Sequence, residues 1–133
     1  MGDGFRIEAI DHVQLAMPPG CEPEAVAFYQ DVLGVPQIPK PAELALRGGC
    51  WFELGTLRLH LGAEEGFTPA RKAHPALVVS GIDQLCAALE ATGHAVRTVE
   101  DVPGMVQRFT SDPFGNRIEL VAAETYVAGE SIP

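Results

Sequence analysis

The stretch Ser111-Asp-Pro-Phe-Gly-Asn-Arg-Ile-Glu-Leu-Val121 combines a tight turn with the strand that follows it. Asp112-Pro113 and Gly115-Asn116 are turn residues, because proline fixes φ while glycine and asparagine tolerate positive φ. The last five residues alternate as in a strand, with Ile118 on one face and Glu119 on the other. A carboxylate in the middle of a strand lies either on a solvated face or in a site.

The composition indicates a single globular domain with an acidic surface. The chain has 133 residues, of which 47% are hydrophobic, and its formal net charge is −9. This charge argues against nucleic acid and anionic membranes as partners. No apolar stretch is long enough to span a bilayer and the first residues do not resemble a signal peptide, so we expect a cytoplasmic protein. The cysteines, Cys21, Cys50 and Cys86, are expected to be reduced and buried.

The first half of the chain, about residues 7–62, is predicted to contain a strand, a helix and three short strands. The strand covers about residues 9–16, and the helix covers residues 22–33, with Pro23 at its start and Gly34 at its end. The three short strands are expected at residues 44–47, 50–54 and 57–61, with glycine-containing turns between them.

The second half repeats this order after a linker at about residues 63–73. The predicted elements are a strand over 74–80, a helix over 82–92, and strands over 95–99, 107–110 and 116–122. The second half therefore covers about residues 74–122, and the tail over 123–133 is expected to be weakly structured, although Tyr126 and Val127 could dock.

The two halves also match residue by residue, as expected for an internal duplication. His12-Val-Gln-Leu-Ala matches His74-Pro-Ala-Leu-Val at an offset of 62 residues, and Leu59-His60-Leu61 matches Ile118-Glu119-Leu120 at an offset of 59. We therefore predict an α+β fold made of two βαβββ modules in tandem. If the two half-sheets curve with their polar faces inward, His12, His60, His74 and Glu119 would converge. Three imidazoles and one carboxylate are a ligand set for a divalent metal.

The sequence resembles the vicinal oxygen chelate superfamily, which includes glyoxalase I, extradiol dioxygenases, and fosfomycin and bleomycin resistance proteins. This resemblance implies a cupped mixed sheet with helices on its outer face, one divalent metal ion at its centre, and a homodimer. The matching stretches are Ile10–Leu15, Phe28–Gly34, Ala73–Val78 and Phe109–Leu120, and together they extend over most of residues 7–122.

The family's metal positions fall on His12, His60, His74 and Glu119 of this chain. His60 stands where typical glyoxalase I enzymes have glutamate, which weakens a glyoxalase I assignment and leaves Glu119 as the predicted catalytic carboxylate. His60 is either a fourth ligand or a donor behind a three-ligand site. Zn, Ni, Mn, Co and Fe all accept such ligands. Whether the site lies within one chain or across a dimer is left open.

Four further residues are predicted to bind the substrate. Arg47, Arg58 and Arg108 lie on predicted strands that would line the cup, where a guanidinium can clamp a carboxylate or phosphate. An outward position on the sheet rim is an equally good interpretation for each. Trp51 is a candidate wall of an apolar pocket.

Three functions fit this pattern. The first is a small metalloenzyme that acts on a compound with adjacent oxygen atoms by isomerase or lyase chemistry. The second is an Fe(II) dioxygenase, because two histidines and a glutamate match the facial triad of these enzymes. The third is a metal-free protein that binds a drug or metabolite. All three have a small molecule as partner, and the sequence does not identify it.

Overall fold

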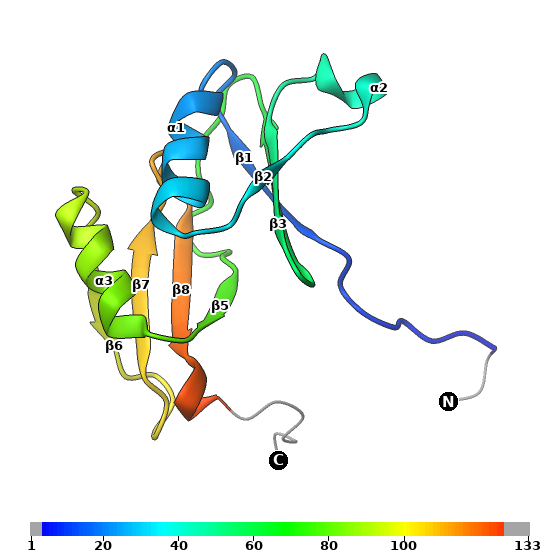
Figure 1. Ribbon diagram of the computed structural model, residues 1–133. Coiled ribbons are helices and arrows are strands. Elements are labelled where there is room, and N and C mark those ends of the chain that lie inside the picture. Colours follow the sequence, from blue (N-terminus) through cyan, green and yellow to red (C-terminus); the bar gives the residue numbers. More distant parts are fainter. Residues whose placement is uncertain (1–3, 127–133) are drawn as a thin grey trace.

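The computed structural model describes residues 4–126 and contains two four-stranded sheets (Figure 1). The first sheet has the order β1-β4-β3-β2 and the second has the order β5-β8-β7-β6. In each sheet the first-named pair of strands is parallel and the other pairs are antiparallel. The predicted α+β fold of two tandem βαβββ modules is confirmed.

The first module contains three helical segments and four strands: β1 (Val13–Met17), α1 (Glu22–Val26), η1 (Ala27–Val32), β2 (Gln37–Ile38), α2 (Ala42–Ala45), β3 (Cys50–Leu54) and β4 (Leu57–Ala63). The second module contains β5 (Ala76–Val79), α3 (Ile82–Ala91), β6 (Arg97–Val99), β7 (Gln107–Ser111) and β8 (Arg117–Ala122), followed by the 3-10 turn η2 (Ala123–Thr125). Within residues 4–126, no helix has the length and apolar character needed to cross a bilayer.

The strand registers reproduce the internal repeat. Gln14 lies opposite His60 in the β1–β4 pair, and Ala76 lies opposite Glu119 in the β5–β8 pair. These two pairs are related by the same offsets, 62 and 59 residues, that the sequence shows. His60 and Glu119 therefore occupy equivalent positions in the two sheets.

One predicted strand is wrong. Residues 44–47 were expected to form a strand, but residues 42–45 form the short helix α2, and Arg47 lies in the turn after it. Pro41 is the N-cap residue of this helix, and the Ala-Glu-Leu-Ala sequence consists of strong helix formers. The helix predicted over 22–33 is present, but its second half, η1, has π-helical hydrogen bonding.

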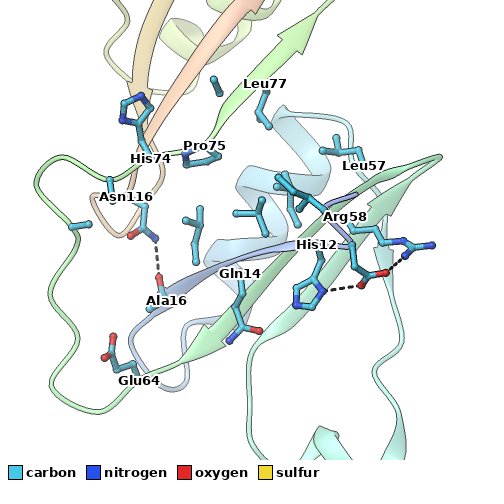
Figure 2. Close-up of a pocket in the computed structure, with 18 of the residues that line it drawn as sticks. His12, Gln14, Ala16, Leu57, Arg58, Glu64, His74, Pro75, Leu77 and Asn116 are labelled. Carbon is cyan, nitrogen blue, oxygen red and sulfur yellow. Dashed lines mark hydrogen bonds and ion pairs between the residues drawn. The ribbon is translucent and has the colours of Figure 1, made fainter. Parts of the chain in front are cut away.

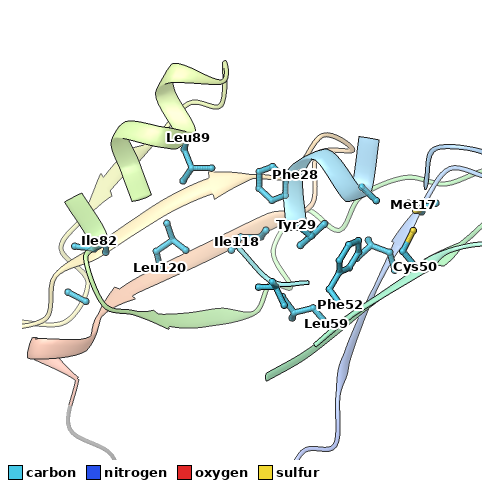
Figure 3. Close-up of a cluster of buried hydrophobic side chains, with 14 residues drawn as sticks. Met17, Phe28, Tyr29, Cys50, Phe52, Leu59, Ile82, Leu89, Ile118 and Leu120 are labelled. Atoms are coloured by element: carbon cyan, nitrogen blue, oxygen red, sulfur yellow. The ribbon is translucent and has the colours of Figure 1, made fainter. Parts of the chain in front are cut away.

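A single hydrophobic core joins the two modules (Figure 3). Phe28 and Tyr29 of η1 are 1% and 0% exposed and pack with side chains of both sheets. The Tyr29 ring stacks on Phe52 of the first sheet at a centroid distance of 5.3 Å. The helices therefore cover one face of each sheet and leave the opposite face free. We call this opposite face the site face; it carries Gln14, His60 and Trp51 in the first sheet and Ala76, Glu119 and Phe109 in the second.

The turn at residues 112–116 connects the modules. The carboxylate of Asp112, only 4% exposed, accepts the hydroxyl of Tyr29 at 2.7 Å and the backbone N–H groups of Phe114 and Asn116, each at 2.9 Å. Asn116 also donates its side-chain amide to Asp112 and to the backbone carbonyl of Ala16 at the end of β1. The turn residues of the second module thus hold η1 and β1 of the first.

The three cysteines are free thiols, as predicted. Cys50 is buried, and Cys21 and Cys86 are half-buried. Burial raises the pKa of each thiol, and nearby carboxylates such as Glu22 beside Cys50 raise it further.

Candidate metal centre

The second module places His74 and Glu119 in direct contact. His74 Nε2 lies 3.0 Å from Glu119 Oε1, while His74 Nδ1 lies 2.7 Å from the carbonyl oxygen of Lys72. Because Nδ1 must donate its proton to that carbonyl, Nε2 of a neutral imidazole presents a lone pair to the carboxylate. Two acceptors at this distance need a cation between them, either a proton on Nε2 or a metal ion. A histidine that donates its other nitrogen to a carbonyl is also the usual arrangement of metal-binding imidazoles.

Gln107 fixes the other oxygen of Glu119. Its amide Nε2 donates to Glu119 Oε2 at 2.6 Å, and its Oε1 accepts the backbone N–H of Val102 at 3.1 Å. Gln107 is only 4% exposed, so both of its polar atoms are used inside the protein. Glu119 therefore keeps Oε1 free to bind a cation, and it holds a fixed orientation.

The first module forms an aromatic stack around His60. The His60 ring lies between His12, at a centroid distance of 4.3 Å, and Trp51, at 4.2 Å. His12 Nδ1 lies 2.9 Å from Asp11 Oδ2, so Nε2 of His12 is the nitrogen that remains for a ligand. The pKa of Asp11 is lowered, first by this hydrogen bond and then by the charge of Arg58. Trp51 thus stands on the site face beside a predicted ligand.

The four predicted metal ligands form two separate pairs within the chain. His12 contacts His60, and His74 contacts Glu119, but among residues 4–126 no three histidine, cysteine or acidic side chains are arranged so that they could hold a metal ion together. A pocket of about 800 Å³ lies between the edges of β1 and β5 and includes both His12 and His74 in its lining. Figure 2 shows these two histidines at different sides of the pocket.

The three arginines predicted to bind substrate have different positions. Arg58 lies on the site face, but Asp11 and Glu53 neutralise it at 2.6 and 3.7 Å. Arg47 follows α2 and is exposed beside a pocket of about 180 Å³ that Trp51 also lines. Both residues are therefore near the first half of the site.

The prediction that Arg108 lines the cup is wrong. Arg108 lies opposite Leu120 in the β7–β8 pair, so its side chain is on the face covered by α3. Its guanidinium donates to the backbone carbonyl of Gln107, and its charge acts on the Cys86 thiol of α3. Because side chains alternate along a strand, the site face receives its neighbour Phe109 instead.

Sequence reasoning missed two polar residues that touch the predicted ligands. Glu53 Oε2 lies 3.2 Å from His60 Nε2, and Gln107 donates to Glu119 as described above. Gln107 could have been found from the hairpin of the two predicted strands at 107–110 and 116–122, in which it is a diagonal neighbour of Glu119. For Glu53, the only signal in the sequence was that it lies two residues after Trp51 and therefore on the same face of the strand.

The comparisons with known proteins agree with this architecture. The family model of the Glyoxalase/Bleomycin resistance protein/Dioxygenase superfamily matches residues 9–120. A glyoxalase family protein from Bacillus anthracis is 47% identical, with a TM-score of 0.84, over 89% of this chain and 97% of that one. The search of curated proteins found no match.

Two further solved structures have different descriptions. Lactoylglutathione lyase from Agrobacterium tumefaciens is 19% identical, with a TM-score of 0.67, over 91% of this chain and 98% of that chain, and this level of identity shows the fold alone. TnmS3, an antibiotic binding protein from a Streptomyces species, is 25% identical, with a TM-score of 0.65, over 87% of this chain and 98% of that chain. Proteins of this fold thus include one named as a lyase and one named as a binding protein.

Proposed function

We propose, from the premise that this chain belongs to the Glyoxalase/Bleomycin resistance protein/Dioxygenase superfamily, that it is a small divalent-metal-dependent enzyme. Its substrate would be a small molecule with adjacent oxygen atoms, and its chemistry would be of the isomerase or lyase type. The contact between His74 Nε2 and Glu119 Oε1 carries this proposal, because a metal ion is one of the two cations, with a proton, that can lie between these acceptors.

The residues present fit a metal ion. His12, His60, His74 and Glu119 would hold it, with His74 oriented by the carbonyl of Lys72. When bound, the metal would stabilise negative charge on a substrate oxygen as a Lewis acid. Glu119 is the carboxylate of this set and would be the catalytic residue; Gln107 holds its Oε2, so Oε1 is the atom directed at the cation position.

We further propose that a second copy of the chain completes the site. β1 and β5 are edge strands, each paired on one side only among the described residues. Val78 of β5 is 49% exposed, and Ile10, three residues before β1, is 79% exposed. Unpaired edges with exposed apolar side chains favour association. If β5 of one copy lay beside β1 of another, the His74–Glu119 pair of the first would face the His12–His60 pair of the second.

The first experiment measures metal content in the purified protein and in the His74→Ala and Glu119→Ala variants. We expect nearly one equivalent of a divalent metal in the wild-type protein and a loss in both variants. A wild-type protein that contains no metal, even after it is reloaded with Zn, Ni, Mn, Co or Fe, would exclude the metalloenzyme.

A second experiment tests the shared site by mixing two inactive proteins. The His12→Ala and His74→Ala variants are unfolded and refolded together, and the mixed dimer is isolated with two different affinity tags. A site shared between copies predicts about one intact metal site per mixed dimer, because the two unaltered modules then face each other. Sites built within one chain predict no recovery, and this result would refute the shared arrangement.

A metal-free binding protein is the second candidate, and two observations favour it. No three predicted ligands gather within the described part of one chain, and the antibiotic binding protein TnmS3 has the same fold at 25% identity. Binding of a small molecule at one equivalent, without turnover and without an effect of a chelator, would support this candidate. Turnover that stops with the chelator would support the enzyme.

A further inference from the structure

Two arginines that the metal proposal does not use lie beside Glu119. Arg97, Phe109 and Glu119 are direct neighbours across β6, β7 and β8, so their side chains form one row on the site face. Arg117 lies two residues before Glu119 on the same strand and therefore shares this face. The guanidinium carbons of Arg97 and Arg117 lie 5.4 and 5.0 Å from the centroid of the Phe109 ring.

The same ring connects the arginines to the proposed metal site. His74 packs edge-on against Phe109 at a centroid distance of 5.0 Å. Phe109 is 8% exposed and forms the floor of a pocket of about 280 Å³, which Arg97, Arg117 and Ser111 also line. A small molecule in this pocket would contact both arginines and Phe109, whose ring also contacts His74 and whose strand partner is Glu119.

The charges of these arginines are not balanced inside the protein. Among residues 4–126, the carboxylates within 4.0 Å of an arginine belong to the pairs of Arg6 with Glu8 and of Arg58 with Asp11 and Glu53. Arg97 and Arg117 have no such partner in this part of the chain. Arg117 is half-buried and Arg97 is exposed, and both line the same pocket, so an anion in it would have two positively charged partners.

We propose that Arg97 and Arg117 bind an anionic group of the substrate, either a carboxylate, a phosphate or a phosphonate. A guanidinium presents a planar fork of donors that matches such groups in a bidentate manner. This inference rests on the proposed function, since it places the anionic group beside the metal site, and it specifies the substrate class. The substrate would carry an anionic group close to the oxygen atoms that reach the His74–Glu119 pair.

The test uses inorganic phosphate as the probe and isothermal titration calorimetry as the measurement. It is carried out on the full-length protein, both metal-loaded and chelator-treated, with the variants Arg97→Gln, Arg117→Gln and the double variant. Arg71→Gln removes the same charge from an exposed residue between the modules and serves as the matched control. Circular dichroism and metal content verify that each variant is folded and loaded as the wild type is.

We expect chelator-treated wild-type protein to bind phosphate, and each single variant to bind it about 10-fold more weakly or worse, because a charge-assisted bidentate contact is lost. The double variant should show no binding, and Arg71→Gln should bind as the wild type does. Equal phosphate affinity in the wild type and the double variant would overturn the proposal. So would an equal loss in Arg71→Gln, since the effect would then depend on net charge alone.

A second readout separates this proposal from the metal site. In Mn²⁺-loaded protein, bound phosphate near the metal should show enhanced relaxation of its ³¹P NMR signal, and Arg117→Lys should reduce it less than Arg117→Gln does. If the protein binds no metal but chelator-treated protein still binds phosphate through both arginines, the anion site stands and the metalloenzyme fails. If metal binds and the arginine variants change nothing, the anion site fails alone.

Discussion

Replacing Tyr29 by phenylalanine tests whether the turn at residues 112–116 holds the modules together. Tyr29 is 0% exposed, and its hydroxyl donates to the buried carboxylate of Asp112 at 2.7 Å. The Tyr29→Phe variant keeps the ring and its packing against Phe52, so it creates almost no cavity. What it removes is one of four hydrogen bonds to a buried carboxylate.

A hydrogen bond to a charged group contributes about 1.5–3 kcal/mol, so Tyr29→Phe should lower the free energy of unfolding by about this amount. Urea denaturation followed by the fluorescence of Trp51, the single tryptophan, measures the change. All samples need the same protein concentration, because the proposed association between copies would also contribute to stability. Tyr126→Phe removes the hydroxyl of the other tyrosine, which is 44% exposed, and serves as the control.

The pH dependence of stability gives an independent measure of the same contact. Burial, and then the charge of Asp112, raise the pKa of Tyr29 well above its usual value of about 10. A raised pKa stabilises the folded state below the unfolded pKa, and this contribution is lost as the pH rises above it. The wild-type protein should therefore lose stability above about pH 10 more steeply than Tyr29→Phe. Equal slopes, together with a Tyr29→Phe effect no larger than that of Tyr126→Phe, would refute the structural role of the contact.

Two other substitutions or reactions test the site and the core. Gln107→Leu removes the donor to Glu119 Oε2 and should weaken metal binding by about 10- to 100-fold, measured in competition with a chelator. Gln84→Leu, on the exposed side of α3, is the control and should leave the metal affinity unchanged. Equal metal affinities in the Gln107→Leu variant and the wild type would show that Glu119 does not need its amide partner. Burial raises the pKa of Cys50. Its thiol should therefore react with Ellman's reagent at least about 10-fold more slowly in the native protein at pH 7.5 than in urea. If Cys50 reacted as fast in the native protein as in urea, this result would contradict its burial.

The sequence predicted the two modules and most of their elements because duplication leaves a visible pattern. It predicted that the four ligands converge, whereas within one chain they form two separate contacts, His12 with His60 and His74 with Glu119. His60 and Glu119 stand at equivalent positions in the two modules, and the strand registers confirm this equivalence. His12 and His74 match in the sequence and lie just before β1 and β5. The alternation of side chains along a strand was sufficient to predict that His60 and Glu119 both lie on the sheet face that the helices do not cover.

The errors arose where the answer depended on neighbours in space. Arg108 and Phe109 are adjacent, and only the pairing of Phe109 with Glu119 shows which of them faces the site. Arg97 and Arg117 are 20 residues apart in the sequence, and only the structure shows that both guanidinium groups lie over the ring of Phe109. The wrong strand at residues 44–47, which included Arg47, was an error of another kind. Pro41 followed by strong helix formers already indicated a helix in the sequence itself.

The hydrogen bonds of the turn separate what holds the fold together from what forms the candidate site. Asp112 and Asn116 use their polar atoms to hold Tyr29 and the end of β1, whereas His12 and His74 are not needed by either contact. A substitution of either histidine should therefore leave the turn and the contacts between the modules in place. In such a variant, a loss of ligand binding can be separated from a loss of folding.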